Sequence, residues 1–257
     1  MPMKSHARKS EVEPAERILR AATAILTAQG RDAVSTRAVS AMADVQSPTI
    51  YRHFGDMQRL LDAAASRGLA DYLNAKRSRQ PTDDPVQDLR VGWNTHVEFG
   101  LSNPHVYTVL YGDPRPGATP EGVAEGDAIL LNLVRRIAEA GRLRTGVERA
   151  AAMMHSACRG VTLTLISMPP ADRDLGLSEA TREVVLSGIT TDAGTMSTGT
   201  GIAPRAVALK SALDPPPSAL TRAETALLAE WLDRLTAEPA SPDQPVRRRS
   251  AGIQPSP

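Results

Sequence analysis

The stretch VSTRAVSAMADVQSPTIYRHFGD, residues 34–56, has the pattern of two short helices joined by a tight turn. Ser35 or Thr36 suits the N-cap of the first helix, because a hydroxyl there can accept a free backbone N–H. Three apolar residues fall on one side of that helix: Val39, Met42 and Ala43. The turn follows at residues 44–46, so the stretch predicts a helix-turn-helix unit.

The second helix of this unit has an apolar and a polar face. Ser47 is predicted as its N-cap, Pro48 takes the first position, where a missing N–H costs nothing, and Gly55 ends it. Ile50 and Phe54 lie four residues apart and share the apolar face. The other side chains lie on the opposite face or its flank: Thr49, Tyr51, Arg52 and His53.

Helices are also predicted on both sides of the unit. Upstream, apolar residues recur at helical spacing from Pro14, and Gly30 ends this pattern in the usual position just after a helix. Downstream, Asp56 is the predicted N-cap of one helix whose apolar face runs from Met57 to about Asn74.

The remaining sequence continues in helical segments, which predicts an all-α protein. The expected helices cover residues 86–101, 104–111, 128–140, 147–168, 178–186 and 221–237. A Gly/Pro-rich loop spans 112–122. The run VTLTLI, residues 161–166, alternates with period two and also fits a strand, although the longer pattern around it favours a helix.

Composition narrows the class of protein. The 257 residues are 41% hydrophobic and 23% charged, as in globular chains, and the aromatic share of 3% favours helices over a β-sandwich. Residues 1–60 contain nine Lys/Arg against six Asp/Glu, a weak indication of an anionic partner. The single cysteine, Cys158, excludes an intrachain disulfide, and neither a metal centre nor a cofactor is expected.

No membrane segment or secretion signal is predicted. No apolar run approaches the roughly 20 residues of a membrane-spanning helix. The polar start of the chain has no apolar stretch of the signal-peptide type behind it. The expected compartment is therefore the cytoplasm.

The polar face of residues 47–54 suits DNA recognition. A helix of this kind enters the major groove, where Thr49 can touch a thymine methyl group and Arg52 can pair with guanine. Tyr51 and His53 are placed to donate to phosphate oxygens. Any three-helix bundle shows polar groups on its free faces, so these residues alone leave a purely structural role open.

The segments ERILRAATAILTAQG (16–30) and VSTRAVSAMADVQSPTIYRHFGDMQRLLDAA (34–64) resemble the DNA-binding domain of the TetR (tetracycline repressor) family of bacterial regulators. The resemblance implies that Thr36 and Arg37 meet the DNA backbone. It places five residues against the bases: Gln46, Ser47, Pro48, Thr49 and Arg52. It also implies that two residues clamp phosphates: Tyr51 and His53.

Two positions depart from the family pattern. Asp44 stands in the turn where the family usually has glycine, although Asp tolerates positive φ better than most residues. Met57 replaces a lysine that commonly touches a phosphate, so that contact passes to Arg59 or to backbone N–H groups, or is lost. Its loss would lower the salt dependence of DNA binding by about one phosphate per half-site.

The later sequence resembles the family less sharply. GWNTHVEFGLSNPHVYTVLYG (92–112), with a Trp-x-x-His element followed by NPxxY, is similar to the Trp-His-Gly type subgroup of C-terminal domains. ACRGVTLTLIS (157–167) resembles a later long helix of that subgroup, which favours helix over strand there. Family members usually pair as homodimers through two C-terminal helices, for which 147–168 and 178–186 are the best candidates.

These observations divide the chain into five expected segments. They are a disordered arm (1–13), a helix-turn-helix DNA-binding domain (14–74), a helical ligand-binding and dimerisation domain (84–190), a flexible connector with an extra helix (191–237) and a disordered tail (238–257). The apolar stripe with Trp231 on the extra helix would either cover the dimer seam or close a pocket.

Unusual side chains concentrate on three helices of the second domain that could form an effector pocket: Trp93, His96, Phe99, Tyr107, Tyr111, Met154, His155 and Cys158. Ordinary core packing is the competing interpretation, above all for Trp93 and Phe99. The low charge of these segments favours a small, mainly apolar effector.

The sequence therefore predicts a homodimeric transcription regulator, most simply a repressor that leaves its double-stranded DNA operator when an effector binds. One alternative is a helical adaptor that acts through protein contacts. Another is an enzyme that uses His155 and Cys158, but no nucleophile-elbow, phosphate-loop or metal-ligand spacing accompanies them. No enzymatic activity is expected.

Overall fold

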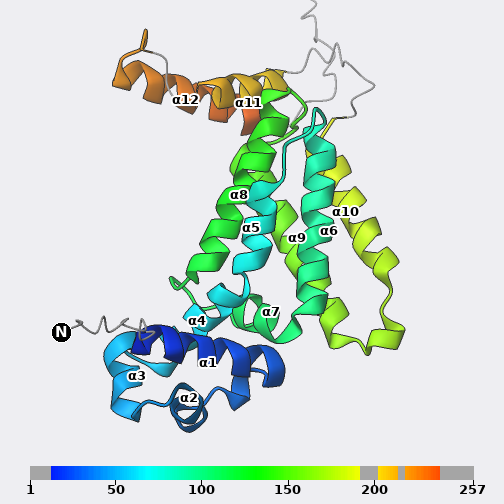
Figure 1. Ribbon diagram of the computed structural model, residues 1–257. Helices are drawn as coiled ribbons and strands as arrows, with labels where there is room; N and C mark the ends of the chain where they lie inside the picture. The colour runs from blue at the N-terminus through cyan, green and yellow to red at the C-terminus, as the bar shows by residue number, and fades with distance from the viewer. Residues whose placement is uncertain (1–12, 192–201, 214–217, 238–257) are drawn as a thin grey trace, which may run out of the picture.

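The computed structural model describes residues 13–191, 202–213 and 218–237, and over these ranges the protein is all-α (Figure 1). The N-terminal helices are α1 (Pro14–Gln29), a 3₁₀ turn (Arg31–Ala33), α2 (Thr36–Ala43), α3 (Ser47–Phe54), α4 (Met57–Gly68) and α5 (Ala70–Ser78). The later helices are α6 (Pro85–Ser102), α7 (Pro104–Tyr111), α8 (Glu121–Glu139), α9 (Val147–Ser167), a 3₁₀ turn (Pro170–Asp172), α10 (Leu175–Ile189), α11 (Ile202–Ala212) and α12 (Arg222–Ala237).

The expected arm, most of the connector and the tail fall outside the described residues, at 1–12, 192–201 and 238–257. Within the described ranges no strand forms, and the VTLTLI run is part of α9. None of the helices in these ranges combines the length and the hydropathy that crossing a bilayer requires.

Local sequence signals set the starts and ends of the first helices as predicted. Ser35 is the N-cap of α2, and its Oγ accepts the Ala38 N–H at 3.2 Å. Gly30 and Gly55 end α1 and α3 at φ 86° and 81°, in the region that favours glycine. Asp44 ends α2 in the left-handed conformation at φ 50°, the role that glycine has in the family pattern.

Two details of the helix-turn-helix unit differ from the prediction. Ser47 is the first residue of α3 rather than its cap, because Gln46 is the N-cap and the Ser47 hydroxyl bonds the Ser40 hydroxyl of α2 at 3.2 Å. Met42 is 56% exposed. The short α2 buries Val39 and Ala43 instead, so Met42 does not belong to its packed face.

The single helix predicted from Met57 to Asn74 is wrong, because the chain divides there into α4 and α5. The break lies where α4 passes closest to α7: a Cβ at Gly68 would stand 3.1 Å from the Val106 side chain. Leu69, at the break, is fully buried. This contact with a later helix has no signature in the local sequence.

Three later boundaries also differ from the prediction. Helix α8 starts at Glu121 instead of 128, since Gly122 packs against α4, with its N–H 3.3 Å from Ser66 Oγ. Helix α10 extends beyond 178–186 at both ends. Helix α11 was not expected next to the Gly/Thr-rich connector, yet it packs against α8 and α12.

Two apolar cores hold the molecule together. The first unites α1 to α5 with α7, and its fully buried members include Ile18, Ile50 and Tyr107. The second unites α6, α8, α9 and α10 around Trp93 and Leu165. Helix α7 thus joins the upper bundle to the N-terminal domain, while α11 and α12 lie at the far end of the molecule (Figure 1).

Candidate nucleic-acid interface and effector cavity

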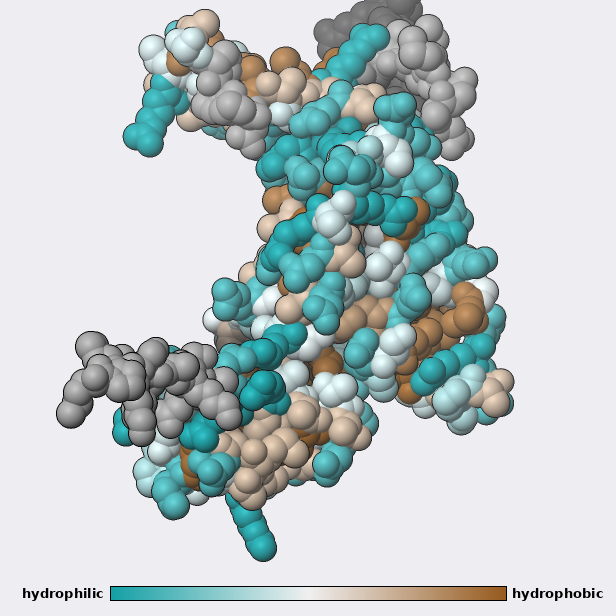
Figure 2. Space-filling model, in the orientation of Figure 1, coloured by the Kyte–Doolittle hydropathy of each residue, from teal (hydrophilic) through white to brown (hydrophobic). Residues whose placement is uncertain are grey.

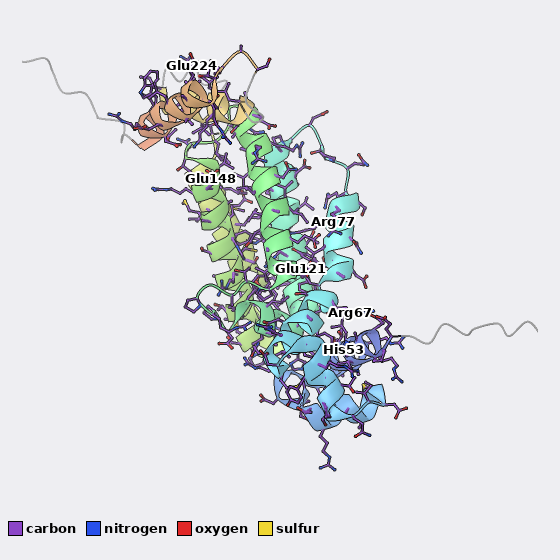
Figure 3. The ribbon with its side chains drawn as sticks, turned by 90° about the vertical axis from the view of Figure 1, so that its left-hand side faces the viewer. His53, Arg67, Arg77, Glu121, Glu148 and Glu224 are labelled. Carbon is purple, nitrogen blue, oxygen red and sulfur yellow. The ribbon has the colours of Figure 1, made fainter. Side chains whose placement is uncertain are left out.

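The polar face of α3 is held outward by a buried apolar face. Ile50 is fully buried, and Phe54 packs beside it against the first core. Arg52 and His53 are exposed, and Tyr51 is 47% exposed. Figure 3 places His53 at the end of the molecule formed by the N-terminal domain, far from Glu224 on α12.

All nine residues assigned to DNA lie on one continuous element: the start of α2, the turn, and α3. None of them is fully buried: Thr36, Ser47 and Thr49 are half-buried, and the others, Arg37, Gln46, Pro48, Tyr51, Arg52 and His53, are exposed. The Thr36 and Tyr51 hydroxyls lie 3.1 Å apart, which ties the start of α2 to α3. The two helices therefore present one polar surface, which we call the reading face.

The arginines of the reading face have no protein partners. Arg37 and Arg52 form no hydrogen bond or ion pair with any described residue. Nearby, Met57 is half-buried against the first core, so its side chain cannot supply the phosphate contact that lysine commonly makes at this position. Arg59, at the start of α4, forms a long ion pair with Asp56 at 3.7 Å. Its side chain is 76% exposed, so this cation can still reach a phosphate.

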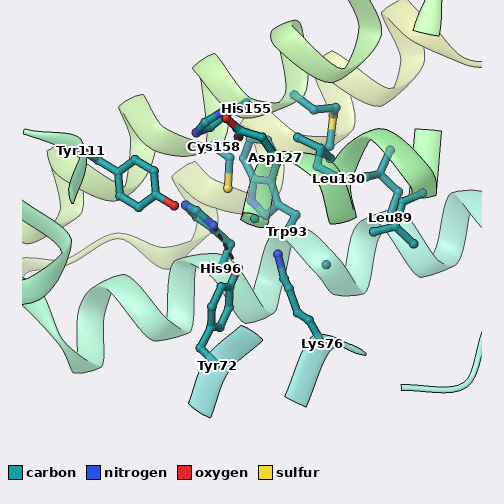
Figure 4. Close-up of a pocket in the computed structure, with 14 residues that line it drawn as sticks. Tyr72, Lys76, Leu89, Trp93, His96, Tyr111, Asp127, Leu130, His155 and Cys158 are labelled. Carbon is teal, nitrogen blue, oxygen red and sulfur yellow. Dashed lines mark hydrogen bonds and ion pairs between the residues drawn. The ribbon is translucent and has the colours of Figure 1, made fainter. Parts of the chain in front are cut away.

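A cavity lies in the second domain, between α5, α6, α7, α8 and α9 (Figure 4). The cavity is a narrow slot whose space measures about 510 Å³ with its mouth included. Six of the eight residues predicted for an effector line it: Trp93, His96, Tyr111, Met154, His155 and Cys158.

Phe99 and Tyr107, the other two predicted residues, do not line the cavity. Phe99 stacks on the Tyr72 ring with centroids 4.7 Å apart, and Tyr107 is fully buried behind His96. Both belong to the first core, so the competing interpretation of core packing is right for Phe99. Trp93 is also in the core, the second one, although its edge reaches the cavity.

A chain of hydrogen bonds runs along one wall of the cavity. His96 Nδ1 lies 3.0 Å from the Tyr72 hydroxyl, and its Nε2 lies 2.8 Å from the Tyr107 hydroxyl. Thr162 donates to the Cys158 carbonyl at 2.7 Å. A neutral imidazole has one N–H, so His96 donates through one ring nitrogen and accepts a tyrosine O–H at the other.

This wall is neutral. Burial lowers the pKa of His96 well below its usual value, with a smaller contribution from the positive charge of Lys76. Burial also raises the pKa values of Tyr72 and Tyr107. The imidazole is therefore uncharged near pH 7 and is satisfied on both nitrogens by the two tyrosines.

The remaining polar side chains of the lining are mostly bonded to the protein as well. Trp93 Nε1 donates to Ser178 Oγ at 2.9 Å, and His155 Nδ1 lies 2.8 Å from Asp127. Burial raises the pKa of the Cys158 thiol to about 12. A thiol held neutral in this way is a poor nucleophile, which does not favour an enzyme that uses Cys158.

The sequence interpretation missed several lining residues. Tyr72 and Lys76 come from α5, which was taken as the end of a longer helix and a polar linker. Leu89, Leu130 and Leu133 are ordinary apolar helix residues whose sequence pattern cannot distinguish core from cavity. For Lys76, its position one turn after buried Tyr72 was a signal, since both then share a helix face.

The fold and the reading face define a helix-turn-helix unit of the kind found in DNA-binding proteins. Residues 18–64 match the sequence profile of the bacterial regulatory proteins of the tetR family. The N-terminal domain is therefore similar to the DNA-binding domain of the tetR family. The assignment of its second domain to the Trp-His-Gly type subgroup stays a prediction.

One curated relative and two solved structures are similar to this chain. Over 114 residues the chain is 29% identical to the tetracycline repressor protein class A from transposon 1721 of Escherichia coli. That match spans 44% of this chain and 52% of the relative, so it covers about half of the relative's length.

The similarity to solved structures concerns the fold alone. A structure from Shewanella sp. PV-4, described as a candidate tetR family transcription regulator, has a TM-score of 0.55 at 17% identity and covers 70% of this chain and 100% of its own. A protein of unknown function from Rhodococcus sp. RHA1 also has a TM-score of 0.55, at 21% identity, with 72% and 100% covered.

Proposed function

We propose that the protein is a homodimeric transcriptional repressor that acts in the cytoplasm and leaves its DNA operator when a small, mainly apolar effector binds. The observation that carries this proposal is the reading face, where Arg37 and Arg52 are exposed above the buried Ile50 and pair with no residue of the described ranges. Unpaired guanidinium groups on a short helix are suited to guanine edges and phosphates.

The test of DNA binding is a selection of genomic fragments with the purified protein, followed by titration of the recovered site at several salt concentrations. We expect sequence-specific binding that weakens steeply with salt. Arg52→Ala should lower the affinity at least tenfold, since one bidentate base contact contributes about 1–3 kcal/mol and a dimer makes two. Arg222→Ala, an exposed arginine on α12, is the matched control and should bind like the wild type.

Failure to recover any specific site would contradict the regulator proposal. Recovery of a site together with normal binding by Arg52→Ala would remove α3 as the reading element. A cellular effect that survives Arg52→Ala would favour the adaptor alternative.

The free faces of α9 and α10 support the homodimer. On α10, four residues at helical spacing are exposed and uncharged: Leu177, Ala180, Val184 and Gly188. On α9, the exposed residues at matching spacing are small: Ala152, Ser156, Gly160 and Thr164. Figure 2 shows brown apolar side chains gathered on the side where α10 runs. Small and apolar faces of this kind let two helix pairs approach closely, as in a four-helix bundle.

Val184→Glu tests this interface. Val184 is 70% exposed, so the substitution should not harm the isolated subunit. In a dimer it would bury two like charges, which costs several kcal/mol and should give monomers in sedimentation experiments. Leu227→Glu, an exposed apolar residue on α12, is the control and should remain dimeric. A dimeric Val184→Glu variant would exclude this face.

Helix α7 offers a route from the cavity to the reading face. Tyr111 lines the cavity and Tyr107 bonds the cavity histidine, while Val106 on the same helix packs against Gly68 of α4. At the other side, a Cβ at Gly30 would stand 3.0 Å from the His105 ring. An effector that moves α7 would therefore displace α4 and the end of α1, and change the separation of the two reading faces.

The extra C-terminal helix, α12, does not take part in this route. Helix α12 packs on α11, and none of its residues lines the cavity. The idea that Trp231 closes the pocket is therefore wrong for this cavity, and Trp231 is 52% exposed.

A further inference from the structure

The cavity contains an ammonium group without a counter-ion. Lys76 comes from α5, and Figure 4 shows its amine directed into the cavity toward Trp93. Among the described residues, Lys76 Nζ has no hydrogen bond and no carboxylate partner; its contact is with the face of the Tyr72 ring, 4.7 Å from the centroid. Burial lowers the pKa of Lys76 to about 8, so the amine is still mostly charged near pH 7.

One more donor faces the same space. The Tyr111 side chain lines the cavity, and its hydroxyl has no hydrogen-bond partner among the described residues, while the hydroxyls of Tyr72 and Tyr107 are used by His96. The only carboxylate of the lining, Asp127, is bonded to His155. A positive charge and a free O–H donor are therefore left over in a cavity whose other polar side chains, apart from the neutral Cys158 thiol, are bonded to the protein.

The surroundings of these donors are apolar. Leu89, Leu130, Leu133 and Met154 line the cavity beside Lys76. Lys76, together with Gly92 and Leu133, also lines a broader groove between α5, α6 and α8 that opens outward. The amine thus stands at the junction of the narrow slot and its entrance.

We propose that the cavity binds an apolar carboxylic acid, whose carboxylate pairs with Lys76 and accepts from the Tyr111 hydroxyl. The apolar body fills the slot between the leucines and Met154. A single negative charge matches the single cation, whereas a dianion such as a phosphate ester would leave charge uncompensated in a buried site. Only the role of this acid as effector rests on the proposed function; the site itself does not.

The test uses pairs of probes that differ in charge alone. Octanoate and octanamide, and 2-naphthoate and 2-naphthamide, are titrated into the full-length protein by calorimetry. We expect at least one acid to bind below 1 mM and at least tenfold more tightly than its amide, since a hydrogen bond to a charged partner contributes about 1.5–3 kcal/mol.

Two variants identify the residue responsible. Lys76→Met keeps most of the length of the side chain and removes the charged amine, so it should lower the acid affinity at least tenfold while the amide affinity stays the same. Lys76→Arg keeps the charge and should retain a preference for acid over amide. Melting curves verify folding, and Lys76→Met should melt no lower than the wild type because it removes a buried charge.

Three results would overturn the proposal: no acid binds up to 1 mM, acid and amide bind equally, or folded Lys76→Met binds the acid like the wild type. A second experiment adds the acid to the protein bound to its selected DNA fragment. Specific DNA binding without acid binding would contradict the acid-site proposal alone. Acid binding without any specific DNA binding would contradict the proposed function but not the acid site.

Discussion

The reading face and the cavity treat polar side chains in opposite ways. On the reading face, Arg37, Arg52 and His53 are exposed, and Arg37 and Arg52 have no partner in the part of the chain that the structure describes. In the cavity, His96 is half-buried and bonded on both nitrogens. A surface site can keep several groups free because water solvates them, whereas a buried site must satisfy nearly every group internally. The rare unpaired group, here Lys76, is then the informative one.

Substitution of the two histidines, His96 and His53, should give the largest difference in the free energy of unfolding. His96→Leu leaves the Tyr72 hydroxyl without its partner and weakens the bonding of Tyr107, so the free energy of unfolding should fall by about 2–4 kcal/mol. His53→Leu should change it by less than about 0.5 kcal/mol, because the side chain is exposed. Urea unfolding measures both.

In DNA titrations, the two substitutions should have effects in the opposite order. His53→Leu should weaken binding several-fold through loss of a phosphate donor, whereas His96→Leu, where still folded, should keep its reading face. If His53→Leu proves the more destabilising of the two, the division into a free surface and a satisfied interior is wrong.

The affinity for an acid probe should depend on pH through Lys76. Below pH 8 the amine is protonated and the affinity should be constant, because the carboxylate stays ionised. Above pH 8 the amine must first take up a proton, so the affinity should fall by up to tenfold per pH unit.

The other titratable groups that line the cavity are Tyr72, His96, Tyr111, Asp127, His155 and Cys158, and the outer groove adds Arg77, Arg79, Asp88, Glu125 and Arg136. Burial raises the pKa values of the two tyrosines and the thiol and lowers that of His96, so these four stay neutral over the range tested. Calorimetry from pH 6.5 to 9.5 measures the effect, and Lys76→Met should show a flat, weak response. A wild-type affinity that is flat through pH 9.5 would show that Lys76 does not hold the carboxylate.

Substitutions at Asp44, in the turn of the reading face, should have the smallest effect on the free energy of unfolding. Asp44 adopts φ 50°, so Asp44→Gly should raise the free energy of unfolding by up to about 1 kcal/mol, and Asp44→Ala should lower it by about 1 kcal/mol. Thermal melts would measure the difference. DNA affinity of Asp44→Gly should not fall, since it also removes a negative charge from the DNA-facing side. Asp32→Gly, outside the left-handed region, is the control and should gain no stability.

The reading face was largely predictable because its signals are local. A cap at Ser35, a turn at Asp44, the Ser-Pro start of α3 and its Gly55 end follow one another within a few residues. The spacing of Ile50 and Phe54 then decides which face points outward. Even here, the Ser47 hydroxyl bonds across to Ser40 instead of capping α3, a contact between helices that local rules do not include.

The cavity was predictable only in part. Its unusual side chains, such as Trp93 and His155, were found because aromatic and imidazole groups are rare in this chain. Lys76 was missed because a lysine beside a polar linker looks like any solvated charge. Only the bend at Leu69, which turns α5 along the bundle, brings that amine among residues of α6, α8 and α9.

The amino-acid order alone determined the helical class, the helix ends set by caps and glycines, and the orientation of α3, since each depends on residues a few positions apart. The tertiary structure decided where α4 breaks, which core α7 joins, and which polar groups remain unpaired. Those outcomes depend on contacts between residues far apart in the chain, such as Gly68 with Val106 and His96 with Tyr72, that local spacing does not encode.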